Sequence, residues 1–152
     1  MTKKAIVLVT LVLLLVGCGG SSPKAKITSV ETVDTINANG VYYKFEGRDN
    51  IKLVLDFTFD ESVAPDLDPT SDEYRKELHA LLVAGAHFYY DDQEVERTWG
   101  YWPNEVGSNF AKELSLFYVV PSNRSADSLR FVYDGEVLGE GATGIDTVIK
   151  PD

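Results

Sequence analysis

The chain has 152 residues, with 14 Lys and Arg against 24 Asp and Glu and a formal net charge of −10. Its length suits one domain, and its 44% hydrophobic and 25% charged residues match a globular protein rather than a disordered, collagen-like or multi-span membrane chain. The acidic balance argues against nucleic-acid binding, because affinity for phosphate backbones depends on Lys and Arg. We therefore expect one acidic folded domain.

The first residues have the pattern of an export signal. Lys3 and Lys4 precede an apolar stretch over residues 5–16 that is interrupted only by Thr10. At about 1.5 Å per residue this stretch reaches about 18 Å, whereas the hydrocarbon core of a bilayer is about 30 Å thick. The pattern therefore predicts a signal peptide over residues 1–17 and not a membrane-spanning helix.

Residues 15–18, Leu-Val-Gly-Cys, resemble the bacterial lipobox, in which an apolar pair and a small residue precede a cysteine that is acylated before cleavage. Cys18 is the only cysteine, so an intrachain disulfide is excluded and lipidation accounts for the lone thiol of an exported protein. The resemblance implies that Cys18 begins the mature protein and carries at least two acyl chains, enough for stable anchoring. An uncleaved anchor helix or a plain secretory signal is the alternative.

The expected mature protein is an acidic domain held close to a membrane. Residues 18–24 comprise the lipidated cysteine and a flexible Gly/Ser tether of at most roughly 25 Å, and residues 25–152 form the domain. Loss of residues 1–17 leaves 12 basic against 24 acidic residues, a net charge of −12. Anionic headgroups should repel this surface, so the lipid provides the attachment. The expected location is extracytoplasmic, on the cell membrane or the outer membrane.

Several segments alternate apolar and polar residues with the period of a β-strand. The clearest is Ile51 to Asp60, and the period recurs from Glu113 to Val120 and from Ser128 to Asp134. Weaker strand patterns cover residues 26–34, 41–46, 86–90, 94–101 and 145–150. Asn39-Gly40 predicts a hairpin turn between residues 26–34 and 41–46. Asp91-Asp92 predicts another between residues 86–90 and 94–101. Seven or eight short strands separated by turns favour a sandwich or barrel.

One segment has the spacing of an amphipathic helix instead. Its apolar positions recur at i, i+4, i+7 and i+8 and comprise Tyr74, Leu78, Leu81 and Leu82. Residues 70–73, Thr-Ser-Asp-Glu, predict a capping box at its start, and Gly85 stands where a C′ glycine would end it. We therefore expect a helix over about residues 71–84, inserted between two strands.

This order of elements resembles the telokin-like, immunoglobulin-like domains of small bacterial lipoproteins. The resemblance consists of the lipobox and tether, the strand over residues 51–59, the hairpin around Asp91-Asp92, and residues 116–121 followed by residues 128–131. It implies an immunoglobulin-like antiparallel β-sandwich that acts as an extracytoplasmic binding or structural module without a known catalytic site. The predicted helix departs from the family pattern.

The chain offers little for nucleophilic catalysis. Its two histidines, His79 and His87, stand on the predicted helix and at the start of a predicted strand, and the sequence contains no Gly-x-Ser-x-Gly motif. Cys18 is assigned to lipid, which leaves no thiol nucleophile. Two histidines without closely spaced ligands also do not make a zinc site. We therefore expect a protein that is not an enzyme.

The acidic loop before the helix raises the question of a metal. Asp66, Asp68 and Asp72 are weak candidates for calcium, because hard cations take about six to eight oxygen ligands and an acidic loop supplies several. The EF-hand spacing is absent. Acidic residues at a helix start also complement the helix dipole without any ion. We therefore expect no metal cofactor and keep calcium as the alternative.

Aromatic residues gather on the predicted hairpin over residues 86–101 and just beyond it. Strand alternation places Trp99 and Tyr101 on one face and Trp102 on the other, so the cluster cannot all be core. These three residues form the candidate binding surface. Exposed rings stack on sugars or anchor protein partners. The alternative is that Trp99 and Tyr101 pack under the helix and that Trp102 covers an edge of the sandwich.

Together these patterns predict a membrane-anchored extracytoplasmic lipoprotein that acts as a non-enzymatic binding or structural module, with an envelope protein or a glycan as partner. Two alternatives stay open. One is carbohydrate or cell-wall ligand binding through the aromatic hairpin. The other is a calcium-stabilised surface domain.

Overall fold

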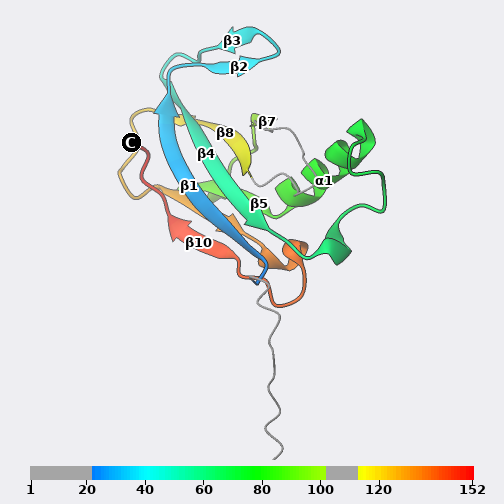
Figure 1. Cartoon of the computed structure of the whole chain (residues 1–152). Coiled ribbons are helices and arrows are strands. Elements are labelled where there is room, and N and C mark those ends of the chain that lie inside the picture. Colours follow the sequence, from blue (N-terminus) through cyan, green and yellow to red (C-terminus); the bar gives the residue numbers. More distant parts are fainter. Residues whose placement is uncertain (1–21, 102–112) are drawn as a thin grey trace, which may run out of the picture.

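The computed structural model describes residues 22–101 and 113–152, and its framework is two four-stranded antiparallel sheets (Figure 1). The first sheet has the order β1 (Lys24–Val33), β4 (Arg48–Thr58), β8 (Glu113–Pro121) and β7 (Trp99–Tyr101). The second has the order β10 (Ile145–Val148), β9 (Leu129–Tyr133), β5 (Ala86–Tyr90) and β6 (Gln93–Glu94). The predicted mainly-β, antiparallel class with one α-helix is confirmed.

The two sheets share one hydrophobic core between them. The inward positions of the central strand β4 are buried and comprise Ile51, Leu53, Leu55 and Phe57. Phe88 of β5 stacks on Tyr118 of β8, with ring centroids 4.2 Å apart. The rings of Phe57 and Tyr133, on β4 and β9, lie 5.3 Å apart. Because each ring pair joins one strand from each sheet, the inward faces meet as in a sandwich.

Helix α1 (Asp72–Ala84) connects the first sheet to the second. Its buried side chains are Tyr74, Leu78 and Leu82, which belong to the same core cluster as the strands. The hydroxyl of Tyr133 on β9 donates to the carbonyl oxygen of Leu82 at 2.7 Å. Apolar packing and this buried hydrogen bond together hold the helix against the second sheet.

The helix begins with a simple cap rather than the predicted capping box. Ser71 is the N-cap, and its hydroxyl oxygen accepts from the backbone N–H of Tyr74 at 3.1 Å. Tyr74 thus occupies the position that a capping box reserves for Glu or Gln. The prediction of a box over Thr70 to Glu73 was one residue out of register, because the hydroxyl of Thr70 instead donates to Asp68.

Gly85 ends the helix as predicted, although for a different reason from the one expected. Its φ of −81° is right-handed, so this position does not need the conformational freedom of a C′ glycine. A Cβ here would lie 2.8 Å from Val137 Cγ2, 2.9 Å from Tyr133 Cζ and 3.0 Å from the carbonyl oxygen of Asp134. The glycine is therefore required by close packing against β9 and the turn that follows it.

A small hairpin lies outside the two sheets. β2 (Ile36–Ala38) pairs with β3 (Val41–Tyr43), and the turn residues Asn39 and Gly40 have φ values of 52° and 83°. The predicted Asn-Gly turn is therefore confirmed. Residues 26–34, however, do not pair with residues 41–46 as predicted, because β1 pairs along its length with β4.

The predicted strand over residues 94–101 is also wrong as a single element. β6 pairs with β5 through the tight turn at Asp91 and Asp92, whereas β7 pairs with β8 in the other sheet. Residues 95–98 therefore pass from one sheet to the other. Residues 135–138 form a 3-10 helix, and another covers residues 61–63.

Replacing Phe88, whose ring lies between the two sheets, should lower the stability of the protein far more than replacing its neighbour Tyr89. We predict that Phe88→Ala lowers the free energy of unfolding by about 3–5 kcal/mol, because it leaves a cavity between the sheets. Tyr89→Ala is the matched control, since Tyr89 contacts Arg130 with the guanidinium carbon 5.8 Å from its ring centroid and should cost about 1 kcal/mol or less. Urea unfolding measures both, and equal losses would contradict the sandwich core.

Candidate functional site

Two of the predicted site residues lie wholly outside what the structure describes. Cys18 and Trp102 lie outside the described residues, together with the signal peptide and most of the tether. The backbone of Trp99 and Tyr101 lies in β7, opposite Phe117 and Ser115 of β8. In the described part of the chain, no helix is long and apolar enough to cross a membrane.

The structure divides the predicted aromatic cluster between two sheets. Tyr89 and Tyr90 lie on β5 of the second sheet, whereas Trp99 and Tyr101 lie on β7 of the first. Tyr90 packs against the core, and Tyr89 lies beside Arg130. These four aromatic residues therefore do not share one hairpin, as the sequence had predicted, whereas the candidate surface of Trp99, Tyr101 and Trp102 stays a prediction.

The acidic residues of the loop before α1 have local partners. The Asp68 carboxylate accepts from the backbone N–H of Thr70 at 2.9 Å and from its hydroxyl at 2.8 Å. These two hydrogen bonds, the backbone one first, hold the pKa of Asp68 below its ordinary value. Asp72 pairs with Arg75 at 3.1 Å, and Asp66 is exposed. Among residues 22–101 and 113–152, no group of three or more His, Cys, Asp or Glu is arranged to hold a metal ion.

Calcium should therefore leave the melting temperature unchanged. One oxygen of Asp68 already accepts from Thr70, and one oxygen of Asp72 already accepts from Arg75, so part of each carboxylate is taken. We predict no shift on addition of millimolar calcium, because a ligand raises the melting temperature only when it binds the native state. Calorimetry of the whole chain measures this. A rise with calcium that disappears in both Asp66→Asn and Asp68→Asn would instead establish a calcium site.

The two histidines lie in separate environments. His87 Nδ1 is 2.7 Å from Glu94 Oε1, so the pair links β5 to β6 at the protein surface. Exposed pairs of this kind contribute about 1 kcal/mol or less. His79 is partly buried on α1, and its pKa is lowered by this burial and by the positive charge of Arg97. The first histidine thus stabilises a short strand pair, and the second belongs to the helix packing.

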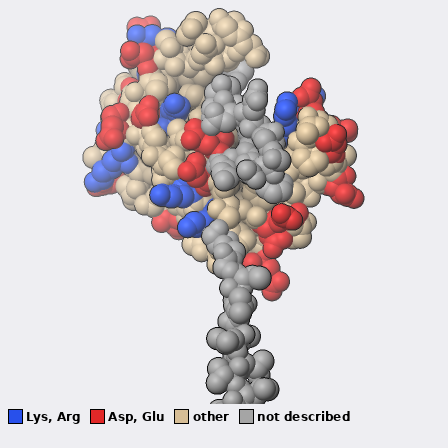
Figure 2. Space-filling view, in the orientation of Figure 1, with Lys and Arg blue, Asp and Glu red and all other residues tan. Residues whose placement is uncertain are grey.

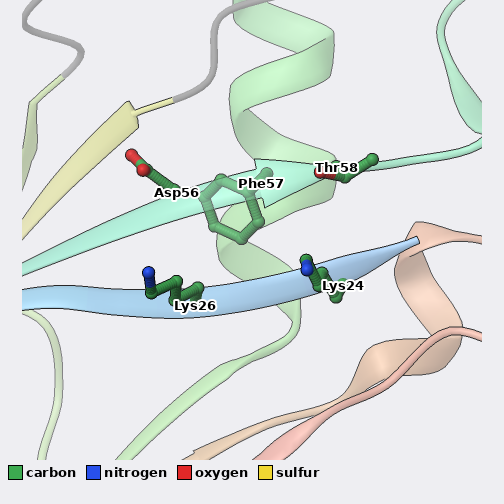
Figure 3. Close-up of a pocket in the computed structure, with 5 residues that line it drawn as sticks. All are labelled: Lys24, Lys26, Asp56, Phe57 and Thr58. Carbon is green, nitrogen blue, oxygen red and sulfur yellow. The ribbon is translucent and has the colours of Figure 1, made fainter. Parts of the chain in front are cut away.

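Two surface pockets are defined by described residues. One, of about 180 Å³, lies over the start of β1 and the end of β4 and is lined by Lys24, Lys26, Asp56, Phe57 and Thr58 (Figure 3). Lys26 and Asp56 are register partners on adjacent strands. Since opposite charges on facing positions stabilise a strand pair, these residues have a structural role in the sheet.

The second pocket, of about 210 Å³, lies between residues 122–126 and the chain end at Lys150 and Pro151. Its cations are already paired. Arg124 forms an ion pair with Asp49 and donates to the carbonyl oxygen of Pro121 at 3.1 Å. Lys150 lies 3.1 Å from Asp127. The contacts of this pocket therefore hold the loop after β8 in place.

The most distinctive surface of the described chain is on the β2–β3 hairpin. Large apolar side chains are exposed there, with exposed fractions of 51% for Val41, 68% for Tyr42, 40% for Tyr43 and 36% for Phe45. We refer to these four residues as the hairpin patch. In Figure 1 the hairpin projects beyond one end of the sandwich, and in Figure 2 most of that end is uncharged, with charged residues at one corner.

The exposed residues of the hairpin stand on both of its faces. Val41 and Tyr43 pair with Ala38 and Ile36, which are buried, whereas Tyr42 pairs with Asn37 on the opposite face. A strand can turn only one face towards a core. The Asn37 side chain accepts from the Gly40 N–H at 3.0 Å, which fixes the turn.

The four residues of the patch expose roughly 400 Å² in total, and Tyr42 lies on the other face of the hairpin from Val41 and Tyr43. Exposed apolar surfaces on monomeric proteins are often functional. The sequence argument missed the patch, although a signal was present. Apolar residues stand at consecutive positions 41, 42 and 43, which a half-buried alternating strand does not show.

Comparison of the chain with protein families, with curated proteins and with solved structures finds no match. The functional argument therefore rests on the chain's own residues and geometry.

Proposed function

We propose that this protein is a lipid-anchored extracytoplasmic module that binds another envelope component without catalysing a reaction, and that the hairpin patch is its contact surface. The observation that carries the proposal is the exposure of Val41, Tyr42, Tyr43 and Phe45 on one projecting element. Exposing these side chains forgoes the stabilisation of burial, which is worth about 25 cal/mol per Å². Such a surface is consistent with selection for contact rather than for stability.

The position of the hairpin suits a membrane-anchored binder. β1 has ten residues and begins at Lys24, the last residue of the predicted tether. At about 3.3 Å per residue it spans about 33 Å, and the hairpin follows its far end (Figure 1). A lipid on Cys18 would therefore leave the hairpin patch at the end of the domain away from the anchor, accessible to other components.

We also assign the sandwich to the immunoglobulin-like class. Two antiparallel four-stranded sheets with a common core support this assignment. Further support comes from the connections that cross between the sheets, from β4 to β5 and from β8 to β9. Immunoglobulin-like sandwiches commonly present binding residues at one end, on the segments that link their strands. The hairpin between β1 and β4 is such a segment.

The lipid anchor can be tested independently of the binding surface. We predict that the full-length chain incorporates labelled palmitate, fractionates with membranes and is processed in a globomycin-sensitive way. Cys18→Ser should be unlabelled and released, because two acyl chains are needed for stable anchoring. Equal membrane association of Cys18→Ser and the natural chain would contradict the proposed anchor.

The contact surface can be tested by photo-crosslinking in intact cells. We predict that a photoreactive phenylalanine at position 42 gives crosslinked adducts, whereas the same group at Thr147 does not. Thr147 is the matched control, because it is exposed on β10, away from the hairpin. Adducts from position 147 but none from position 42 would contradict the hairpin patch as the contact surface.

A further inference from the structure

The hairpin carries an open strand edge as well as exposed rings. In the described part of the chain, β3 pairs with β2 alone. Ala38 and Val41 flank the two-residue turn and face one another, and such a pair exchanges both of its backbone hydrogen bonds. The N–H and C=O of the next residue, Tyr42, therefore point away from β2. They are available to a further strand.

The first sheet shows how this chain protects another edge. On β1, the outer side is occupied at one end by residue 143, whose N–H donates to the Pro23 carbonyl oxygen at 3.0 Å. At the other end Asp152 accepts from Thr32 at 3.1 Å and donates to Val30 at 3.2 Å. The register of β1 also shifts between Ile27 and Ser29. Coverage and irregularity of this kind prevent edge pairing.

The edge strands of the second sheet carry charged residues. β10 includes Asp146, whose carboxylate takes two hydrogen bonds from Arg130, both at 2.7 Å. β6 has only two residues, one of them Glu94. By contrast, β3 is Val-Tyr-Tyr, with no charge, no proline and no register shift. Although β3 has only three residues, it therefore lacks the charge, the proline and the register shift that blunt other edges.

We infer that the open edge of β3 receives an extended segment of a protein partner as an added strand. The inference rests on the proposed function, because it identifies the partner bound by the hairpin patch. Main-chain hydrogen bonds with Tyr42 align the segment, and the exposed rings contact its alternate side chains. This mode uses the edge and the patch together.

The polarity of the hairpin apex favours a protein over a bilayer. The turn consists of Asn39 and Gly40, and the aromatic residues follow it along one arm. Inserting this tip into hydrocarbon would bury the Asn39 amide and the turn backbone, each at a cost of several kcal/mol. A strand approaching from the side meets Val41 to Phe45 and leaves the apex in water.

Charge favours a different protein over a second copy of this chain. The net charge is −10, so two copies repel each other. Asp34 and Glu46 stand at the base of the hairpin, and Lys44 is the only charged residue between them. The partner segment is therefore extended, apolar at alternate positions and uncharged to basic at its ends.

The experiment compares two substitutions at one position in the full-length chain in intact cells. Tyr42→Thr and Tyr42→Pro both remove the ring, but only the second removes the outward N–H. A photoreactive phenylalanine at Phe45 reports the yield of adducts. We expect Tyr42→Thr to retain protein adducts and Tyr42→Pro to give about tenfold fewer adducts than Tyr42→Thr. Proline removes the N–H at position 42, so a carbonyl group of the added partner strand is left without a donor.

Hydrogen exchange supplies a second measurement, which does not depend on how the proline variant folds. In native membranes the amide of Tyr42 in the natural chain should exchange at least about tenfold more slowly than in the purified chain, since an added strand protects it. Equal exchange rates would overturn the added strand. The amide of Asp146, on β10, is the internal control and should not change.

The outcomes separate this inference from the proposed function. Protein adducts that fall equally in Tyr42→Thr and Tyr42→Pro would show recognition through the ring alone and overturn strand addition while leaving the binding module intact. Adducts with lipid or with a second copy of the chain would also overturn it. No adduct from position 45 in the natural background would contradict both proposals.

Discussion

The aromatic contact between the two sheets is the constraint on which the rest of the structure depends. Phe88 stacks on Tyr118 at 4.2 Å, and the inward residues of β4 and β9 belong to the same core cluster. Once the sheets face each other, the chain has to cross between them. The first crossing, from β4 to β5, contains α1, and residues 95–98 make the second. The helix therefore connects the two sheets, and its apolar side completes the core between them.

The same constraint explains why the hairpin is exposed. β1 and β4 are paired along nearly their whole length, so the residues that join them emerge at the end of the sandwich, beyond its second layer. A hairpin in that position has little core to pack against, and its aromatic residues face water. Ile36 and Ala38 are buried, whereas Tyr42 is 68% exposed. The hairpin patch thus follows from the sheet register and from the apolar residues on both faces of β3.

Several described titratable groups serve local structure. Asp68 accepts from Thr70, the His87–Glu94 pair joins two strands, and Arg130 holds Asp146. The cations that line the pocket near the chain end are paired as well. A surface rich in acids can therefore support a binding role without a reactive centre, because its charges maintain turns and strand edges. The proposed function accordingly rests on shape, apolar exposure and open backbone groups.

The sequence by itself determined the elements whose patterns are local. The strands at residues 51–60, 113–120 and 128–134, the helix at about 71–84 and the turns at Asn39-Gly40 and Asp91-Asp92 all follow from periodicity or from residues that tolerate positive φ. Only the tertiary structure decided that β1 pairs with β4, that residues 94–101 divide between two sheets, and that Val41 to Tyr43 of the hairpin are exposed. Alternation shows that a strand has one apolar face, but the partner of that strand is distant in sequence. Pairing and exposure therefore depend on which surfaces meet, and local residue patterns do not encode this.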